Sequence, residues 1–461
     1  MSTAPLPPQP GGTLLGGNYR EMKQDWLAAY TRYARNHGNV VAYRIGPVRC
    51  ALITDPELIA DLLLRSGKRL KKSSAEQMLR PLVGNGIFLS EGAKWVQQRR
   101  LVAPPFHRDA VRVYATTMVE VANNHMTSFA ANETRDFYRD AKQIGIRIVS
   151  STLFGAEILQ DSRRVEEIFT EAGEAISARL DSALPLPGWV PTKAVRRIRM
   201  ARAEIDRLID EVVAQRSKDS DPAARTDLIS LLMSARTSEK GEADAQLKDE
   251  AATLFLAGFE TTAITIAWAI WLIATHPTVA AHVRAELDGV LAGRSPTADD
   301  LPRLTYLEQV VFETMRLYPP AWLFAREAIE DLEVGGYRIP KGWSVEFSQW
   351  VMHRDPRFWE RPEEFLPERW ADGLASRLPR FVYFPFGAGS RICIGAAFAK
   401  MEAMLVLAAV LFQFDVQPDG VDVTPDPGFI LRPSPGVPLK LQRRAAAGGE
   451  RGVPRSTRAT A

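Results

Sequence analysis

The stretch AATLFLAGFETTAITIAWAIWLIAT, residues 251–275, restricts the fold of this chain more than any other feature. Its only charged residue is Glu260. As a helix the stretch is roughly 38 Å long, which is enough to cross a bilayer. A carboxylate near the middle of such a helix costs about 3 kcal/mol in lipid, and charged segments with a helical pattern flank the stretch on both sides. We therefore expect a buried core helix, and a membrane span is the alternative.

The composition is typical of a soluble globular protein. Of the 461 residues, 46% are hydrophobic and 25% are charged, and the net charge is only +3. The sequence contains no dense basic block or nucleic-acid-binding motif, so we expect no nucleic-acid partner. Two cysteines, Cys50 and Cys393, suit a reducing compartment without a disulfide framework. The Pro/Gly-rich start lacks the basic and apolar regions of a signal peptide, which indicates a cytoplasmic protein without a transmembrane anchor.

Periodicity predicts a mainly α fold with a small β-rich subdomain. Residues 39–54 alternate around Gly46-Pro47 as a hairpin does, and Asp55-Pro56 marks the start of a helix. Cys50 falls in the second strand, where a small core residue is expected. A second β-rich patch covers residues 331–349, with Gly335-Gly336 as its turn. Helical patterns cover residues 109–130, 135–155, 161–180, 196–217, 224–237, 278–292, 304–317 and 396–413.

Loops and termini complete this outline. We expect a loop at 184–192 and a loop-rich region at 353–392. No internal repeat or shift in composition divides the chain, so residues 18–442 are predicted to form one domain. Residues 1–17 are predicted to be a flexible leader, and residues 443–461 a disordered basic tail.

The segment FPFGAGSRICIG, residues 384–395, places Cys393 in a glycine-rich turn just before an apolar helix. A lone cysteine of this kind is a core residue, a nucleophile or a metal ligand. No histidine lies near it in sequence to serve as a base, and zinc requires several ligands at short spacing. A haem iron, in contrast, takes a single thiolate. The turn amides and the positive end of the following helix favour a thiolate and lower the pKa of its thiol, and Arg391 is suited to bind a haem propionate.

The pattern Phe386-x-x-Gly389-x-Arg391-x-Cys393-x-Gly395 resembles the haem-binding signature of the cytochrome P450 family. The resemblance covers roughly residues 18–442 and implies the family's fold, a triangular helical domain around a buried haem b, with Cys393 as the axial ligand of the iron. Phe386, Gly387 and Gly395, together with Ala257 on the central helix, are then expected beside the haem. The segments GNGIFLSEGAKW and HRDPRFW resemble soluble bacterial members of the fatty-acid-hydroxylase kind.

Residues 257–262, AGFETT, resemble the oxygen-activating segment of the family's central helix. The resemblance implies that Gly258 leaves a groove for O2 beside the haem. Glu260 and Thr261 are then the catalytic residues, which supply protons through a carboxylate and a hydroxyl. A core helix with a tolerated glycine and a buried glutamate is the alternative.

Glu313 and Arg316 match the E-x-x-R pair of the family, and Arg369 in PERW (367–370) matches its third member. The i,i+3 spacing places the first two on one helical face. The resemblance implies that these three residues form a buried structural network that supports the haem loop. Without Cys393, the same pair would indicate only a surface ion pair.

Further haem contacts follow from the resemblance. Trp95 and Arg99 match a W-x-x-x-R helix whose side chains bind a propionate, and Arg326 lies where the family places another propionate partner. A plain surface arginine is the alternative for Arg326. In the frame of these motifs, the substrate pocket is expected to be lined by Phe88, Leu256, Ala257, Ala321, Trp322 and Leu323.

The expected function is that of a haem-thiolate monooxygenase. Such an enzyme inserts one oxygen atom of O2 into a C–H bond or double bond of a lipophilic molecule, such as a fatty acid, terpene or steroid. A separate ferredoxin or flavodoxin with its reductase is expected to supply electrons on the Cys393 side, where Arg100 and Lys400 are candidate contacts. The alternatives are a peroxide-dependent or isomerising haem-thiolate enzyme and a non-catalytic haem sensor.

Overall fold

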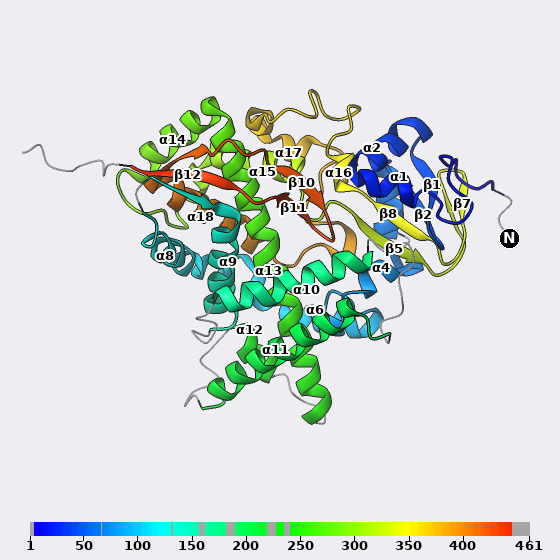
Figure 1. Cartoon of the computed structure of the whole chain (residues 1–461), viewed down its shortest axis with the longest axis horizontal. Coiled ribbons are helices and arrows are strands. Elements are labelled where there is room, and N and C mark those ends of the chain that lie inside the picture. Colours follow the sequence, from blue (N-terminus) through cyan, green and yellow to red (C-terminus); the bar gives the residue numbers. More distant parts are fainter. Residues whose placement is uncertain are drawn as a thin grey trace, which may run out of the picture.

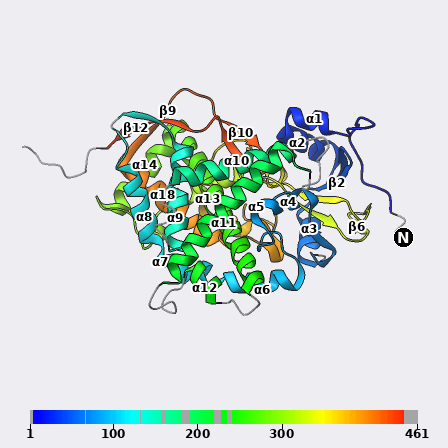
Figure 2. The same ribbon diagram turned by 60° about the horizontal axis from the view of Figure 1, so that its bottom comes forward.

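The long helix α13 (Lys240–Thr275) runs through the middle of the fold, and the other helices pack around it (Figure 1). The computed structural model describes residues 4–65, 67–130, 132–155, 162–180, 190–218, 227–234 and 240–444. Helices α9, α15 and α18 contact α13 directly, and α10 and α11 pack on each other at its side (Figure 2). The core is therefore built around the apolar stretch at residues 251–275.

The remaining helices are mostly short at the N-terminal end of the chain and long in its middle. They are α1 (Tyr19–Gln24), α2 (Trp26–His37), α3 (Pro56–Ala60), α4 (Ser74–Gln77), α5 (Arg80–Val83), α6 (Gly92–Val102), α7 (Arg108–Val113), α8 (Ala115–Met126), α9 (Phe137–Leu153), α10 (Ser162–Leu180), α11 (Lys193–Arg216), α12 (Leu228–Ser234), α14 (Pro277–Leu291), α15 (Thr305–Leu317), α16 (Gln349–Met352), α17 (Leu374–Arg377) and α18 (Ala396–Gln413).

In the part of the chain that the structure describes, twelve strands form small sheets beside the helical body. They are β1 (Val40–Ile45), β2 (Val48–Ile53), β3 (Leu70–Lys72), β4 (Glu133–Asp136), β5 (Phe324–Ala328), β6 (Leu332–Val334), β7 (Tyr337–Ile339), β8 (Ser344–Phe347), β9 (Phe414–Pro418), β10 (Thr424–Pro427), β11 (Leu431–Ser434) and β12 (Pro438–Arg443). A five-stranded sheet has the order β1-β2-β8-β5-β3, a three-stranded sheet has the order β4-β12-β9, and β6–β7 and β10–β11 are hairpins. In the first sheet, β2 and β8 are parallel and the other pairs are antiparallel.

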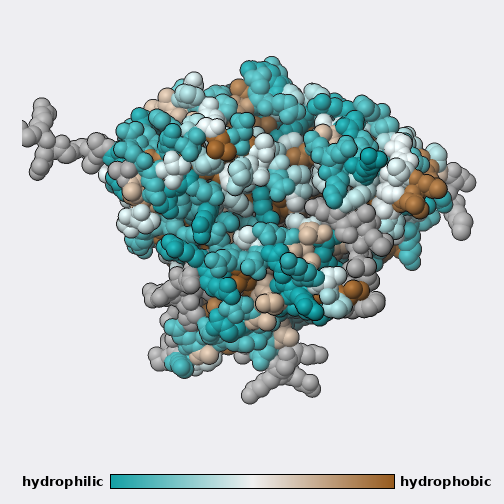
Figure 3. All heavy atoms as spheres, in the orientation of Figure 1, coloured by the Kyte–Doolittle hydropathy of each residue, from teal (hydrophilic) through white to brown (hydrophobic). Residues whose placement is uncertain are grey.

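Burial in protein accounts for the apolar stretch. Two helices of the described residues, α13 and α18, are long and apolar enough to cross a membrane, and 72% and 67% of their most apolar windows are buried. Ile264, Ala267 and Ile270 of α13 are completely buried. On the face shown in Figure 3, hydrophobic residues form small separate patches within a mostly hydrophilic surface. These observations fit a core helix, as predicted.

Most predicted elements are present. Strands β1 and β2 form the predicted hairpin and Cys50 is buried in β2. Asp55 caps α3 by accepting hydrogen bonds from the amides of Glu57 and Leu58. The bounds of α18 are those predicted.

The structure differs from the prediction at one helix and at several strands. The helix predicted at 109–130 is divided at Tyr114 and ends at Met126, where the hydroxyls of Thr127 and Ser128 bond the last helical carbonyls. Strands β9 to β12 were not predicted, although residues of β9 and β12 alternate between apolar and polar. Most of the loop at 184–192, parts of the helix at 224–237 and residues 445–461 of the predicted tail lie outside the described residues.

The described part of the N-terminal leader lies against the sheets. The carbonyls of Pro5 and Pro8 accept hydrogen bonds from the amides of Arg338 and Ala42. Thr13 and Gly17 exchange a pair of backbone hydrogen bonds. Whether the leader is flexible in solution stays a prediction.

Candidate functional site

The Cys393 loop is a tight turn that leads directly into helix α18. The amide of Cys393 donates to the carbonyl of Phe386 (2.9 Å), and the amide of Gly387 donates to that of Phe384 (2.9 Å). Gly389 has a φ of +69°, and a Cβ there would lie 2.7 Å from a backbone oxygen of Leu63. Glycine at this position therefore sets the path that presents the cysteine.

A histidine holds the start of this loop. The amide of Phe384 donates to Nε2 of His353 at 3.0 Å, so this nitrogen must be unprotonated. Burial, together with neighbouring Arg316 and Arg354, lowers the pKa of His353 well below its ordinary value. The ring is therefore neutral near pH 7, and the acceptor stays available to the loop.

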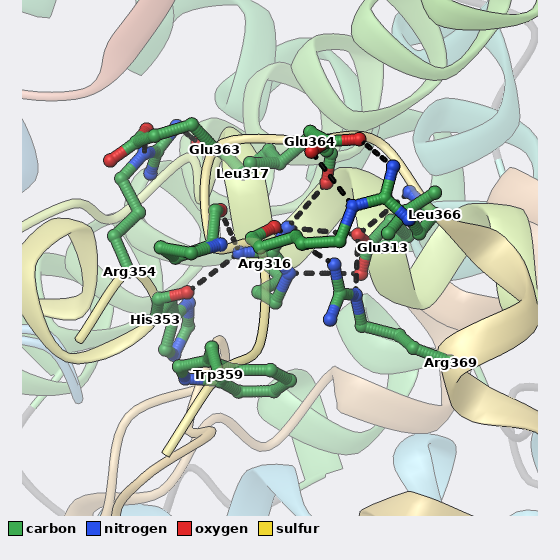
Figure 4. A network of polar contacts seen from close by, with 12 residues as sticks. Glu313, Arg316, Leu317, His353, Arg354, Trp359, Glu363, Glu364, Leu366 and Arg369 are labelled. Atoms are coloured by element: carbon green, nitrogen blue, oxygen red, sulfur yellow. Dashed lines mark hydrogen bonds and ion pairs between the residues drawn. The ribbon is translucent and has the colours of Figure 1, made fainter. Parts of the chain in front are cut away.

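The three predicted network residues meet in a buried cluster behind the loop (Figure 4). Glu313 and Arg316 are completely buried and paired at 2.8 Å, and Arg369 binds the same carboxylate at 2.9 Å. Trp370 donates its indole N–H to Glu313 at 2.8 Å. Arg316 also donates to the carbonyl of His353 at 2.9 Å. The Glu313 carboxylate thus pairs with both guanidinium groups, backbone carbonyls accept further hydrogen bonds from Arg316, and the cluster connects to the histidine that holds the loop.

A cavity of about 850 Å³ lies between the Cys393 loop and α13. Cys393 faces this cavity, and Thr261 of α13 also lines it. The structure brings all six predicted pocket residues to its wall: Phe88, Leu256, Ala257, Ala321, Trp322 and Leu323. The wall is largely apolar, with ionisable groups gathered in places.

Opposing effects act on the pKa of the Cys393 thiol. Burial raises its pKa above the ordinary value, and the amide of Gly395 and the cation of Arg99 lower it by less. Burial also lowers the pKa of Arg99. The net rise differs from the lowering predicted from the helix end and turn, because desolvation of the sulfur is the larger effect. A thiolate at this depth needs a further positive partner.

Cationic side chains cluster at one end of the cavity. Arg391 stacks on the ring of Trp95, with the guanidinium carbon 4.3 Å from the ring centre, and donates to the carbonyl of Ser90 at 2.7 Å. Its Nη1 atom is buried and has no hydrogen-bond partner among the described residues. Arg326, Arg99 and Trp95 line the same cavity. An anionic ligand at this end would complete the hydrogen bonding of Arg391.

Two residues at this end were missed by sequence reasoning. Glu76 binds Arg326 at 2.9 Å and Lys72 at 2.8 Å, and all three side chains are nearly buried. Burial acts to raise the pKa of Glu76, but the two cations lower it overall. Burial lowers the pKa of Lys72 to about 8. The K-x-x-x-E spacing at one helical start was the available signal, although it is a weak one alone.

Helix α13 presents Ala257 and Thr261 to the cavity. The Thr261 hydroxyl donates to the carbonyl of Ala257 at 2.8 Å. Gly258 lines the cavity, and a Cβ there would lie 3.1 Å from the side chain of Val149 on α9. The missing side chain lets α9 and α13 pack closely, and the groove for O2 expected from this glycine stays a prediction.

Glu260 is bound by an arginine from the C-terminal hairpin. Arg432 of β11 donates to Oε1 of Glu260 from Nε (3.0 Å) and from Nη2 (2.8 Å). Both side chains are mostly buried and both line the cavity. No local sequence pattern could have indicated this partner, since 172 positions separate the two residues.

The start of α13 fixes the loop that carries Phe88. Asp249 accepts from the amide of Asn85 (2.7 Å), and Glu250 accepts from the amide of Ile87 (2.9 Å). A Cβ on Gly84, whose φ is +61°, would lie 1.8 Å from the Asp249 carboxylate. These contacts set the position of the cavity wall at Phe88.

Two candidate contacts for an electron donor differ in their surroundings. Lys400 forms an ion pair with Glu308, and its ammonium lies 4.8 Å from the centre of the Phe312 ring. Arg100 is exposed on α6. Exposed Val96 and Ile392 lie on α6 and in the Cys393 loop.

Comparisons with known proteins agree with this geometry. The family model described as Cytochrome P450 matches residues 7–441. Cyclooctatin synthase of Streptomyces melanosporofaciens is 34% identical over 430 residues, which is 92% of this chain and 93% of that protein. Cyclooctat-9-en-7-ol 5-monooxygenase of the same organism is 33% identical over 387 residues, 83% of each chain. Pentalenene oxygenase of Streptomyces avermitilis is 30% identical over 396 residues, 84% of this chain and 87% of that protein.

The buried Glu250 carboxyl, which accepts from the amide of Ile87, predicts that the free energy of unfolding depends on pH. Burial raises the pKa of Glu250 from 4.5 to about 7. Because the folded pKa is the higher one, ionisation costs folding free energy as the pH rises through this range, and the full cost, up to about 3 kcal/mol, is present above pH 7. Glu250→Gln removes that cost, so its stability relative to the natural chain should increase between pH 5 and pH 8 in urea denaturation.

The exposed Glu57→Gln variant is the control, and its difference from the natural chain should not change with pH. A stability difference for Glu250→Gln that is the same at pH 5 and pH 8 would contradict the buried acid.

Proposed function

Because this chain belongs to the cytochrome P450 family of haem-thiolate monooxygenases, we propose that Cys393 is the axial ligand of its haem iron. The observation that carries this proposal is the position of the cysteine. Its thiol faces the cavity from a turn that the neutral His353 and the Glu313–Arg316 pair hold in place. Among the described residues no group of three or more His, Cys, Asp or Glu side chains could hold a metal, so the site suits a metal that needs one protein ligand.

The residues present fit haem b. The macrocycle is apolar with two carboxylates at one edge, and the cavity has largely apolar walls with cations at one end. We propose that Arg391, Arg326, Arg99 and Trp95 hold the propionates, and the unpartnered Nη1 of Arg391 supports this. Phe386, Gly387 and Gly395 would lie beside the sulfur. The iron provides the positive partner that the raised pKa of the thiol requires.

A haem held by these residues would supply the oxygen chemistry, namely activation of O2 with external electrons and transfer of one oxygen atom to the substrate. The chain contributes position, shielding from water and protons. Leu256, Ala257 and Phe88 exclude water from the cavity and orient an apolar molecule. We propose that Thr261 donates a hydrogen bond toward O2 after its hydroxyl leaves the Ala257 carbonyl, and that Glu260 renews the proton.

The substrate is proposed to be a terpene-like hydrocarbon or alcohol. Two relatives are named as oxygenases of pentalenene and of cyclooctat-9-en-7-ol, and the cavity wall is mostly apolar. Fatty acids and steroids share this lipophilic character and belong in the same screen.

The proposed electron donor is a separate ferredoxin or flavodoxin in the cytoplasm. Enzymes of this family use O2 and a redox partner. Exposed Arg100, with Val96 and Ile392 close by on the Cys393 side, supports docking of an acidic partner there. A peroxide-dependent or isomerising enzyme, or a haem sensor, would have no use for Glu260 and Thr261 at the cavity.

Reconstitution tests the monooxygenase proposal. Holoprotein, a bacterial ferredoxin with its reductase, NADPH and isotope-labelled O2 are incubated with pentalenene, geranylgeraniol or lauric acid. We expect one labelled oxygen atom in the product and no product when ferredoxin and reductase are omitted. Product from NADPH alone would contradict the separate donor, and unlabelled product would contradict the monooxygenase.

Thr261→Ala tests the proposed role of the hydroxyl. We expect roughly tenfold less product per NADPH consumed, with more hydrogen peroxide, because protons then reach oxygen without a positioned donor. Thr275→Ala is the matched control, since its hydroxyl makes the same bond to the carbonyl four residues earlier on α13 (2.9 Å) but does not line the cavity. Equal product yield in Thr261→Ala and Thr275→Ala would contradict the role of Thr261.

A further inference from the structure

We propose that Arg432 is a positioning residue for Glu260, and that their ion pair ties this acid to the hairpin β10–β11 where it separates the haem cavity from a second cavity. The inference rests on the proposed function, because it assumes that Glu260 acts beside a haem. Its consequence is that a molecule moving between the two cavities also releases Glu260.

The ion pair is well formed and poorly solvated. Both donor nitrogens of Arg432 converge on Oε1 of Glu260, at 3.0 and 2.8 Å. The side chains are 18% and 11% exposed, so little water competes for them. Charged or titratable groups that face the pair are Tyr138 of α9 and Asp426 of β10.

The surroundings are shaped for the guanidinium. A Cβ on Gly173 of α10 would lie 2.6 Å from Nη2 of Arg432, so any larger residue there displaces the arginine. The pKa of Arg432 is raised, since Glu260 and Tyr138 outweigh the lowering by burial. The arginine therefore remains charged and keeps its place.

The second cavity, of about 1110 Å³, lies between α2, α10 and the hairpin. Both cavities are lined by Trp26, Ser177, Pro427, Gly428 and Arg432. The hairpin between them is anchored in three places. Trp322 donates its indole N–H to the carbonyl of Gly428 (3.0 Å), Leu431 donates its amide to Pro320 (2.9 Å), and Arg432 binds Glu260. A Cβ on Gly428 would lie 2.9 Å from Oγ of Ser177, so the tip fits tightly against α10.

Movement of the hairpin β10–β11 and release of the Glu260 carboxylate from Arg432 are thus linked. A molecule that is too large to pass the tip must move β11, and this breaks the bonds between Arg432 and Glu260. When the hairpin returns, Arg432 again holds the carboxylate in one orientation beside Thr261. Arg432 acts through Glu260 and does not itself touch the reacting atoms.

Ligand association tests the link. The probes are 4-phenylimidazole, which is bulky, and imidazole, which is small, and binding of each to the holoprotein is followed by the Soret band in stopped flow. Arg432→Gln and Gly173→Ala should each speed association of 4-phenylimidazole by about tenfold, the effect of losing one ion-pair anchor, and leave imidazole nearly unchanged. Gly289→Ala on α14 is the matched control, because its added Cβ meets nothing within 4 Å.

A second readout separates positioning from mere structure. The share of NADPH electrons that ends in product rather than in hydrogen peroxide should fall in Arg432→Gln, because Glu260 loses the contact that fixes its orientation. Arg432→Lys restores the charge and should return this share most of the way to that of the natural chain.

The outcomes are distinguishable from failure of the proposed function. If the natural chain shows no Soret response to imidazole, the haem proposal itself falls. If the response is normal but both probes change equally in Arg432→Gln and Gly173→Ala, or neither changes, the hairpin link is wrong. An unchanged share of NADPH electrons in product for Arg432→Gln overturns the positioning of Glu260.

Discussion

A continuous path of hydrogen bonds leads from the buried Glu313 carboxylate to the Cys393 turn, and the site depends on it. Glu313 fixes Arg316, Arg316 binds the carbonyl of His353, and His353 accepts the amide of Phe384. Within the turn, the amide of Cys393 then donates a hydrogen bond to the carbonyl of Phe386. Glu313 and Arg316 have no exposed surface, so loss of Glu313 would leave the Arg316 cation buried without its carboxylate partner. The position of the Cys393 sulfur therefore depends on buried residues that do not touch it, beginning with Glu313.

Helix α13 both fills the core and positions polar groups at the cavity. Its central residues Ile264 to Ile270 fill the core, and this burial offsets the cost of the polar groups that the same helix brings to the cavity. Gly258 allows α9 to approach closely. Near its start, Asp249 and Glu250 hold the loop that carries Phe88. One rigid element thus fixes both the cavity wall and the acid–alcohol pair.

Local sequence patterns predicted the parts of the site that are local in structure. The Cys393 turn, the Glu313–Arg316 spacing and the bounds of α18 follow from glycine conformation and helical periodicity within a few residues. The ion pair of Glu260 with Arg432 and that of Glu76 with Arg326 could not be predicted, because they join segments that only the tertiary fold brings together. The contact of Gly258 with Val149 could not be predicted for the same reason, since Val149 lies on another helix. Strands β9 to β12 are only four to six residues long and were missed, although residues of β9 and β12 alternate between apolar and polar.

The central claim is the bond between the Cys393 sulfur and haem iron, and the carbon monoxide difference spectrum of the reduced holoprotein tests it most directly. A thiolate ligand gives a strongly red-shifted Soret band, which we predict for the natural chain and not for Cys393→His. A nitrogen-type spectrum from the natural chain, or a thiolate-type spectrum from Cys393→His, would contradict the account.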